Sequence, residues 1–225
     1  TTMILIYIYI NFTVQLIGGY EIGEFFNRPY AGTVLAYGDF IDKFGYIRGN
    51  LSVGSYLKYS EFEQGLADLT IRYASPVSNL NNGRFRNYLD IHLTYGYRRL
   101  PGEVILLNDQ YGMEGLSNND LSGQKRFVTS WESVYYTPWY IYGFATAIYG
   151  YIDIGILSGE NQSIFDSKVY TGLGLGIRIR NENLVFNTLQ LQITYFPRPP
   201  AGASNIEFSS SGIPEIHLQG FYSVA

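Results

Sequence analysis

Residues 126–138 (RFVTSWESVYYTP) and residues 141–157 (IYGFATAIYGYIDIGIL) decide the fold. Side chains alternate between apolar and polar along both segments with a period of two, which predicts β-strands. In the second segment, one face carries large apolar residues, namely Phe144, Ile148, Ile152, Ile154 and Ile156. Because both segments are longer than a usual strand of roughly five or six residues, we expect this face to be covered by a second sheet, by helices or by lipid.

Each segment also carries one carboxylate on the face opposite to its apolar row. Glu132 shares its face with Arg126 and Val128, and Asp153 shares its face with Tyr149. Side chains two residues apart lie on the same side of a strand. Both acids are therefore predicted to face an interior.

The same alternation recurs along most of the chain. It appears in residues 4–16, 30–40, 47–58, 67–73, 88–98, 169–180, 188–195 and 213–225. With the two central segments, these ranges predict about ten strands, and no segment shows a helical period longer than two turns. Residues 4–16 lack a basic flank and fall short of the roughly 20 apolar residues of a membrane-spanning helix, so we expect one strand there.

Composition excludes several classes of function. The 225 residues include 22 Tyr and 14 Phe, and tyrosine suits a boundary between membrane and water. Charged residues make up 15% and the net charge is −4, so no basic surface for nucleic acid is expected. The absence of cysteine excludes disulfides and thiolate metal sites.

Two all-β architectures fit these patterns. A soluble β-sandwich has an apolar inward face and a solvent face rich in Lys, Glu and Asp. The polar faces here are instead rich in Tyr, Gly, Gln, Thr and Arg, and many strands reach the roughly nine to eleven residues that cross a bilayer at a tilt. We therefore expect residues 1–225 to form one antiparallel transmembrane β-barrel of the outer-membrane type, integral to a bacterial outer membrane and in contact with its lipid.

Connection lengths support the barrel in the later half of the chain. Tight links are predicted around Pro138 and at residues 181–183, and long polar links at residues 100–125, 158–167 and 197–212. The earlier half breaks this alternation, because the link at 75–86 is longer than the link at 59–65. The aromatic residues that flank Pro138 are candidates for a membrane-interface girdle: Tyr135, Tyr136, Trp139, Tyr140 and Tyr142.

The long link and the two strands after it carry a set of residues in a recognisable order. The link, at about residues 100–125, contains Met113, Glu114, Gly115 and Leu116, and the strands contain Glu132, then Asp153 followed by Gly155. This run resembles the BamA/TamA family of outer-membrane assembly barrels in the bacterial surface-antigen superfamily, especially its Bacteroidetes-type members. In that family an inserted loop carries a Val/Ile-Arg-Gly-Phe/Tyr motif, the next strand a Glu, and the following strand Phe-x-Asp-x-Gly.

The resemblance implies a sixteen-strand barrel, of which this chain would be the C-terminal part, with the C-terminal strand region at about 205–225. A self-contained ten-strand barrel is the alternative. The implied function is non-enzymatic insertion or translocation of other outer-membrane proteins, with nascent proteins or other envelope-complex subunits as partners and no cofactor. A passive pore, or a structural subunit of an envelope complex, is the alternative function.

This sequence departs from the family at one important position. Glu114 stands where the family has Arg, so the implied salt bridge would become a cluster of three carboxylates with Glu132 and Asp153. Like charges this close disfavour joint ionisation, so either the loop sits elsewhere or a basic residue intervenes. We expect Arg178 or Arg126 to pair with Asp153 or Glu132, the alternative being that both acids are ordinary solvated side chains.

Catalytic and metal sites are weakly indicated. His92 shares a face with Asp90, but no Gly-x-Ser-x-Gly elbow accompanies them, so a hydrogen-bonded pair is expected in place of a lipase-like triad. Asn118, Asn119 and Asp120 are candidates for weak calcium binding. The alternating Gly172, Gly174 and Gly176 are expected to leave room inside the barrel for a plug or the inserted loop.

Overall fold

The computed structural model describes residues 4–9, 12–23, 27–100, 102–109, 111–116, 121–141, 143–180, 188–200 and 202–212. Nearly all regular structure in these ranges is antiparallel β-sheet, with one 3-10 turn, η1 (Ile164–Asp166). The prediction of an all-β antiparallel fold is confirmed. No helix in these ranges has the length and apolar character needed to cross a membrane.

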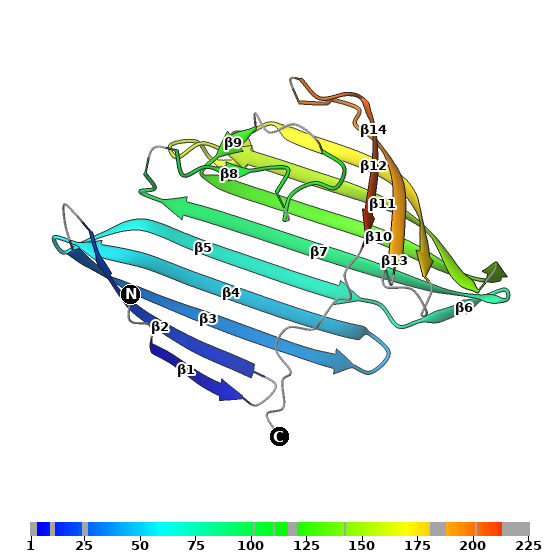
Figure 1. Cartoon of the computed structure of the whole chain (residues 1–225), viewed down its shortest axis with the longest axis horizontal. Coiled ribbons are helices and arrows are strands. Elements are labelled where there is room, and N and C mark those ends of the chain that lie inside the picture. The colour runs from blue at the N-terminus through cyan, green and yellow to red at the C-terminus, as the bar shows by residue number, and fades with distance from the viewer. Residues whose placement is uncertain are drawn as a thin grey trace.

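Eleven strands follow one another in chain order through one sheet, and the short β6 (Ser78–Leu80) pairs with β7 beside them (Figure 1). The path comprises β1 (Ile4–Tyr9), β2 (Phe12–Ile22), β3 (Asn27–Ile41), β4 (Gly45–Lys58), β5 (Glu61–Ala74), β7 (Gly83–Tyr97), β10 (Lys125–Ile141), β11 (Phe144–Ser158), β12 (Val169–Arg180), β13 (Thr188–Tyr195) and β14 (Ile206–Gly212). Among the described residues no pairing joins β1 to β14, so the sheet is open at these two edges.

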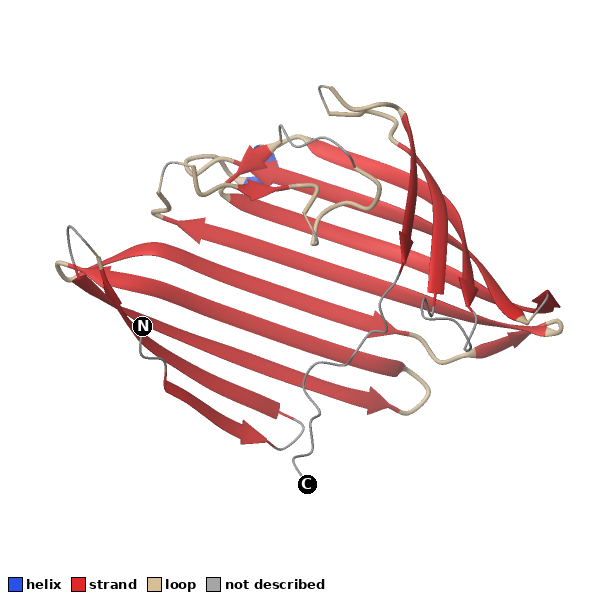
Figure 2. Ribbon diagram, in the orientation of Figure 1, coloured by secondary structure: helices blue, strands red, loops and turns tan. Residues whose placement is uncertain are grey.

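Figure 2 shows long strands running side by side in a curved sheet, with the connection between β7 and β10 lying over one face. We call this face the inner face; in β11 it carries Tyr149, Tyr151 and Asp153, all of them buried. The opposite, outer face of β11 carries Ile148, Ile152 and Ile154, which are 43%, 48% and 37% exposed. No protein layer covers these isoleucines in the described chain.

Strand registers extend the apolar outer face from β2 to β13, because directly paired residues lie on the same side. Ile152 pairs with Trp131 of β10 on one side and with Leu173 of β12 on the other. Exposed apolar residues occupy the same face on both halves of the sheet: Leu16, Leu51, Val53, Trp131, Leu173, Leu175, Ile177, Leu189, Leu191 and Ile193.

The inner face is filled partly by aromatic rings lying on glycine. A Cβ added to Gly174 would lie 2.1 Å from the Tyr151 ring, and one added to Gly176 would lie 2.3 Å from the Tyr149 ring. The room expected there for a plug or the inserted loop is filled by tyrosines of β11 at Gly174 and Gly176, so that expectation was wrong at these two glycines. Such rings shield the backbone that glycine exposes.

Two predicted strand boundaries were wrong. Residues 4–16 are not one strand, since β1 and β2 pair antiparallel with Tyr9 opposite Thr13. Pro138 is not in a turn but inside β10, where the register shifts between Tyr136 and Tyr140; the chain reverses between Ile141 and Phe144. A local irregularity accommodates a proline that lacks the N–H needed by a regular ladder.

The end of the sheet also differs from expectation. The last described strand, β14, covers residues 206–212, and the strand predicted at 213–225 lies outside the described residues. The long connections at 98–124, 159–168 and 196–205 all lie on the same side of the sheet, at the strand ends, as predicted. The two-residue turn at Tyr59 and Ser60 lies on that side too, so the earlier half does break the alternation of connection lengths.

Candidate functional site

The connection at residues 98–124, called the inserted loop below, folds back over the inner face of β10 to β13. It contains a two-stranded sheet of its own, β8 (Ile105–Leu106) and β9 (Ser122–Gly123). Its apolar side chains Leu107, Met113 and Leu116 are buried against Val128 of β10 and Phe196, which follows β13. The loop therefore has a small hydrophobic core in common with the sheet.

Gly155 of β11 leaves the space into which the loop tip fits. A Cβ at this position would lie 2.6 Å from the Sδ of Met113 and 3.0 Å from the Cδ1 of Leu107. The first distance is too short for a Cβ contact and the second is tighter than most such contacts. Gly115 in the loop has a φ of 73°, a conformation that favours glycine. Glycines in the strand and in the loop thus permit this close approach.

The side chain of Asp153 holds the loop by accepting a hydrogen bond from the loop backbone. The Glu114 N–H donates a hydrogen bond of 2.9 Å to Asp153 Oδ2, and the Asp153 side chain is 1% exposed. Ser130 lies directly opposite Asp153 in the β10–β11 register. Asp153 is therefore not a solvated acid, and that alternative is wrong for this residue.

Arg178 neutralises Glu132, and this is one of the pairings that the sequence predicts. The Arg178 Nη1 donates to Glu132 Oε1 at 2.7 Å, and Nη2 donates to Oε2. Arg178 is fixed further by a 3.0 Å bond from its Nε to Gln190 Oε1 and by its place over the Tyr149 ring. Two parallel hydrogen bonds make this a directional, charge-assisted pair.

The carboxylate of Glu114 completes the cluster. Its surface is exposed to solvent, yet it sits within the concave inner face, where surrounding protein weakens its hydration. This shielding, with the charges of Asp153 and Glu132, raises the pKa of Glu114 to about 7, although Arg178 and Gln192 act in the opposite direction. Of the two expected outcomes for Glu114, the loop does reach the acids and a basic residue intervenes.

Arg126 takes a different role from the expected one. It does not pair with either acid of the strands; its Nη1 lies 2.5 Å from Asp109 Oδ2 and 2.6 Å from the Leu106 carbonyl oxygen. Its Nη2 donates to Thr94 Oγ1 at 3.2 Å, and the side chain is buried. Arg126 thus holds the inserted loop on the sheet. Asp109 lies in a segment without alternation of apolar and polar residues, so the sequence does not predict it as a partner of Arg126.

His92 is another unexpected anchor. Its Nε2 lies 2.7 Å from Asp68 Oδ2 and its Nδ1 lies 2.9 Å from Thr70 Oγ1, while Tyr111 of the loop stacks on the ring at 4.6 Å. The predicted pair with Asp90 was wrong, because Asp90 bonds to Arg72. Thr70 of β5 lies directly opposite His92, and Asp68 lies diagonally from it, opposite Thr94, so both side chains are within reach of the His92 ring.

Within the described ranges, no three His, Cys, Asp or Glu side chains gather as a metal site. The calcium candidates Asn118, Asn119 and Asp120 lie outside the described residues.

Comparison of the sequence with models of known protein families and with curated proteins finds no match. The likeness of residues 100–155 to the BamA/TamA family therefore stays a prediction.

Proposed function

We propose that this chain forms part of an integral β-barrel of a bacterial outer membrane that inserts or translocates other outer-membrane proteins. One observation carries the proposal: the apolar face of the sheet is exposed, while the opposite face is covered over β10 to β13 by an inserted loop. A soluble protein rarely exposes a continuous apolar patch above a few hundred Å². Contact with hydrocarbon would make this orientation favourable.

In lipid, the backbone groups at β1 and β14 need partners, because no water satisfies them there. Pairing with further strands beyond the eleven of the described residues would close a sixteen-strand barrel, which is the arrangement that the family resemblance implies. Direct pairing of β1 with β14 would close a self-contained barrel.

The docked loop supports the assembly function over other barrel functions. At the positions that match the family's motifs, Asp153 accepts the loop N–H, Gly155 accommodates Met113, and Glu132 is held in an ion pair. The proposed partners are outer-membrane lipid and nascent outer-membrane proteins. No catalytic step is proposed.

One observation favours the second candidate, a passive pore or a structural subunit of an envelope complex. The cation at the acids comes from Arg178 of β12, within the sheet, and not from the loop. The Arg178–Glu132 pair is therefore made within the wall itself, without a loop side chain. Such a loop would serve as a static plug.

Depletion of the protein in its native host separates the two functions. The proposed function predicts that several unrelated outer-membrane proteins decrease in the membrane and accumulate as unfolded precursors. A passive pore or structural subunit predicts normal levels of those proteins with altered solute uptake or loss of one complex, and that result would refute the assembly function. Loss of a lipid-hydrolase activity on His92→Ala would refute the non-enzymatic assignment.

A further inference from the structure

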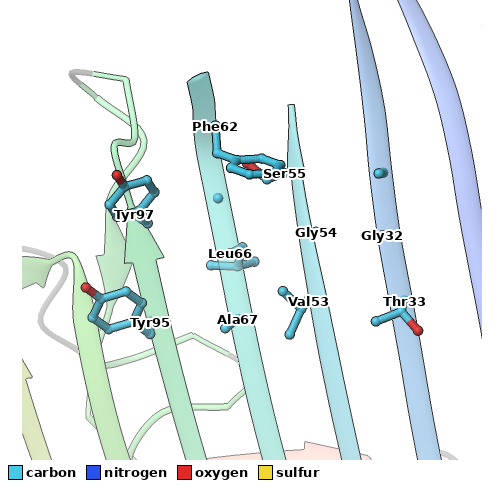
Figure 3. A pocket seen from close by; sticks show the side chains of 12 residues that line it. Gly32, Thr33, Val53, Gly54, Ser55, Phe62, Leu66, Ala67, Tyr95 and Tyr97 are labelled. Atoms are coloured by element: carbon cyan, nitrogen blue, oxygen red, sulfur yellow. The ribbon is translucent and has the colours of Figure 1, made fainter. Parts of the chain in front are cut away.

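The two faces of the sheet differ in the charges that they carry. On the outer face, a hollow of about 710 Å³ across β3, β4, β5 and β7 is lined by small, apolar and aromatic residues, such as Val53, Ala67 and Tyr95, and by no charged side chain (Figure 3). On the inner face, charged side chains gather towards the strand ends that lie opposite the long connections. We call this the turn side; there β3 is joined to β4, β5 to β7 and β10 to β11.

Arginine predominates on the inner face at the turn side. Arg72 of β5 pairs with Asp90 of β7, and Asp90 pairs with Ser130 of β10, so these residues form one row across the sheet. From this row to the turn side, the arginines of the inner face are Arg48, Arg72, Arg84, Arg86, Arg178 and Arg180, and the carboxylates are Asp90, Glu132 and Asp153. Arginines therefore outnumber carboxylates in this region of the described chain.

The carboxylates of this region already have partners. Asp90 accepts a bond of 3.0 Å from Arg72, and Glu132 is paired with Arg178. Asp153 accepts the N–H of the inserted loop. Three arginines have no carboxylate within ion-pair distance in the part of the chain that the structure describes: Arg84, Arg86 and Arg180. The region therefore carries positive charge that an external anion can neutralise.

Arg84 and Arg86 are spaced to match an extended polypeptide. Residues two apart on a strand point to the same side, about 6.5–7 Å from each other. Alternate side chains of an extended ligand have the same spacing, so acidic residues at every second position would each face one guanidinium. Arg86 is oriented by a bond of 2.9 Å from its Nε to the Ser75 carbonyl oxygen and by the Tyr88 ring at 5.3 Å. Its remaining N–H donors can bind a carboxylate through two parallel hydrogen bonds.

The arginines are accessible in the described chain. Arg84 and Arg180 are exposed, and the side chain of Arg72 is 56% exposed. The inserted loop covers the inner face nearer the long connections, where its tip reaches Gly155 and Asp153. A polypeptide that approaches the inner face of the curved sheet from the turn side therefore meets the arginines before it meets the loop (Figure 2).

We propose that the inner face at the turn side binds an acidic, extended polypeptide segment, with carboxylates at alternate positions on Arg84 and Arg86. The inference rests on the proposed function and specifies its partner. The acidic segment belongs to a nascent outer-membrane protein that enters the barrel from the turn side. Charge complementarity with the excess of arginine provides the attraction, which is expected to weaken as the salt concentration rises.

Fluorescence anisotropy of a labelled peptide, added to the whole protein in phosphatidylcholine nanodiscs, tests the binding surface. The peptide carries Glu at every second position, and a second peptide carries Gln in place of each Glu. The Glu peptide is expected to bind and the Gln peptide is not. The double variant Arg84→Gln with Arg86→Gln loses two exposed ion pairs to the ligand, so its binding of the Glu peptide is expected to be about tenfold weaker at low ionic strength.

A matched control removes the same charge on the side of the long connections. Lys168 and Arg198 are exposed there, and the double variant Lys168→Gln with Arg198→Gln is expected to bind the Glu peptide as the unmodified protein does. Equal binding by the two double variants, or equal binding of the two peptides, would overturn the proposed surface. Displacement of the Glu peptide by inorganic phosphate at equal total charge would show a site for small anions and would overturn the polypeptide ligand.

Depletion in the native host tests the proposed function separately from this surface. Normal levels of outer-membrane proteins, together with Glu-peptide binding that only the Arg84 and Arg86 substitutions weaken, would refute the assembly function and leave the acidic ligand in place. Decreased levels of those proteins, together with peptide binding that does not depend on Arg84 and Arg86, would overturn the surface alone.

Discussion

Glu114 places a carboxyl where the family that this chain resembles places an arginine. In the docked loop its pKa rises from an ordinary 4.5 to about 7, so the docked state binds more protons than the undocked state between these values. The contribution of Glu114 is therefore expected to weaken docking as the pH rises through the range from about 4.5 to about 7.

Glu114→Gln removes this titration while keeping the shape of the side chain and the backbone N–H that bonds to Asp153. At pH 8 the variant loop is expected to be better protected than the unmodified loop, and the difference is expected to shrink as the pH falls and to vanish well below pH 4.5, where Glu114 is protonated in both states. Amide hydrogen exchange of residues 113–116, compared between the two proteins at each pH, measures the difference. A variant that shows the same pH dependence as the unmodified protein would contradict the assigned role of Glu114.

Arg178 and Glu132 form a partly buried pair, so removal of one partner leaves the other charge without compensation. We expect Arg178→Met to lower the free energy of unfolding by about 3 kcal/mol and the double variant with Glu132→Gln to lose clearly less. Urea unfolding in vesicles of both single variants and the double variant gives the coupling energy. Additive losses would show that the two side chains do not interact.

The sequence predicts this pair as one of four alternatives, in which Arg178 or Arg126 pairs with Asp153 or Glu132, but it does not predict the contacts that anchor the loop. Alternation places Glu132 and Arg178 on the inner face, and their opposite charges suggest the contact. The contacts of His92 with Asp68 and of Arg126 with Asp109 depend on strand register and on an irregular loop. Neither property follows from a period of two.

The sequence likewise predicts the faces of the strands better than it predicts the positions of the turns. The alternation identifies the faces of the strands, but it does not locate the reversal between β1 and β2. Even-numbered residues pair with even-numbered residues there, for example Ile8 with Val14, so the apolar period continues unbroken through the reversal. Pro138 suggests a turn by its chemistry alone, although an irregular strand also accommodates it.

The inserted loop depends on a glycine in the strand beneath it. Gly155→Val would place methyl groups where Met113 now lies, and we expect the loop tip to be displaced and the bond from Glu114 to Asp153 to break. Hydrogen exchange at the Glu114 amide is expected to accelerate at least about tenfold, which corresponds to about 1.4 kcal/mol.

Gly49→Val is the matched control for this change. Gly49 lies in β4 with no atom within 4 Å of the added Cβ, so the loop amides should keep their protection. Unchanged exchange in both variants would mean that the Met113 contact does not hold the loop.

Whether water or lipid surrounds the outer face determines how much stability is lost when a charged side chain is placed there. Ile152 is half exposed near the middle of β11, and in water its replacement by a charged residue would change stability by less than about 0.5 kcal/mol. In a bilayer, Arg at this depth is expected to cost about 2–4 kcal/mol. Ile152→Arg should therefore reduce both insertion into vesicles and resistance to urea, whereas Asn50→Arg, on the inner face of β4, should be tolerated. If Ile152→Arg yielded a protein as stable as the unmodified one, the outer face would be in contact with water, and the transmembrane barrel would have to be rejected.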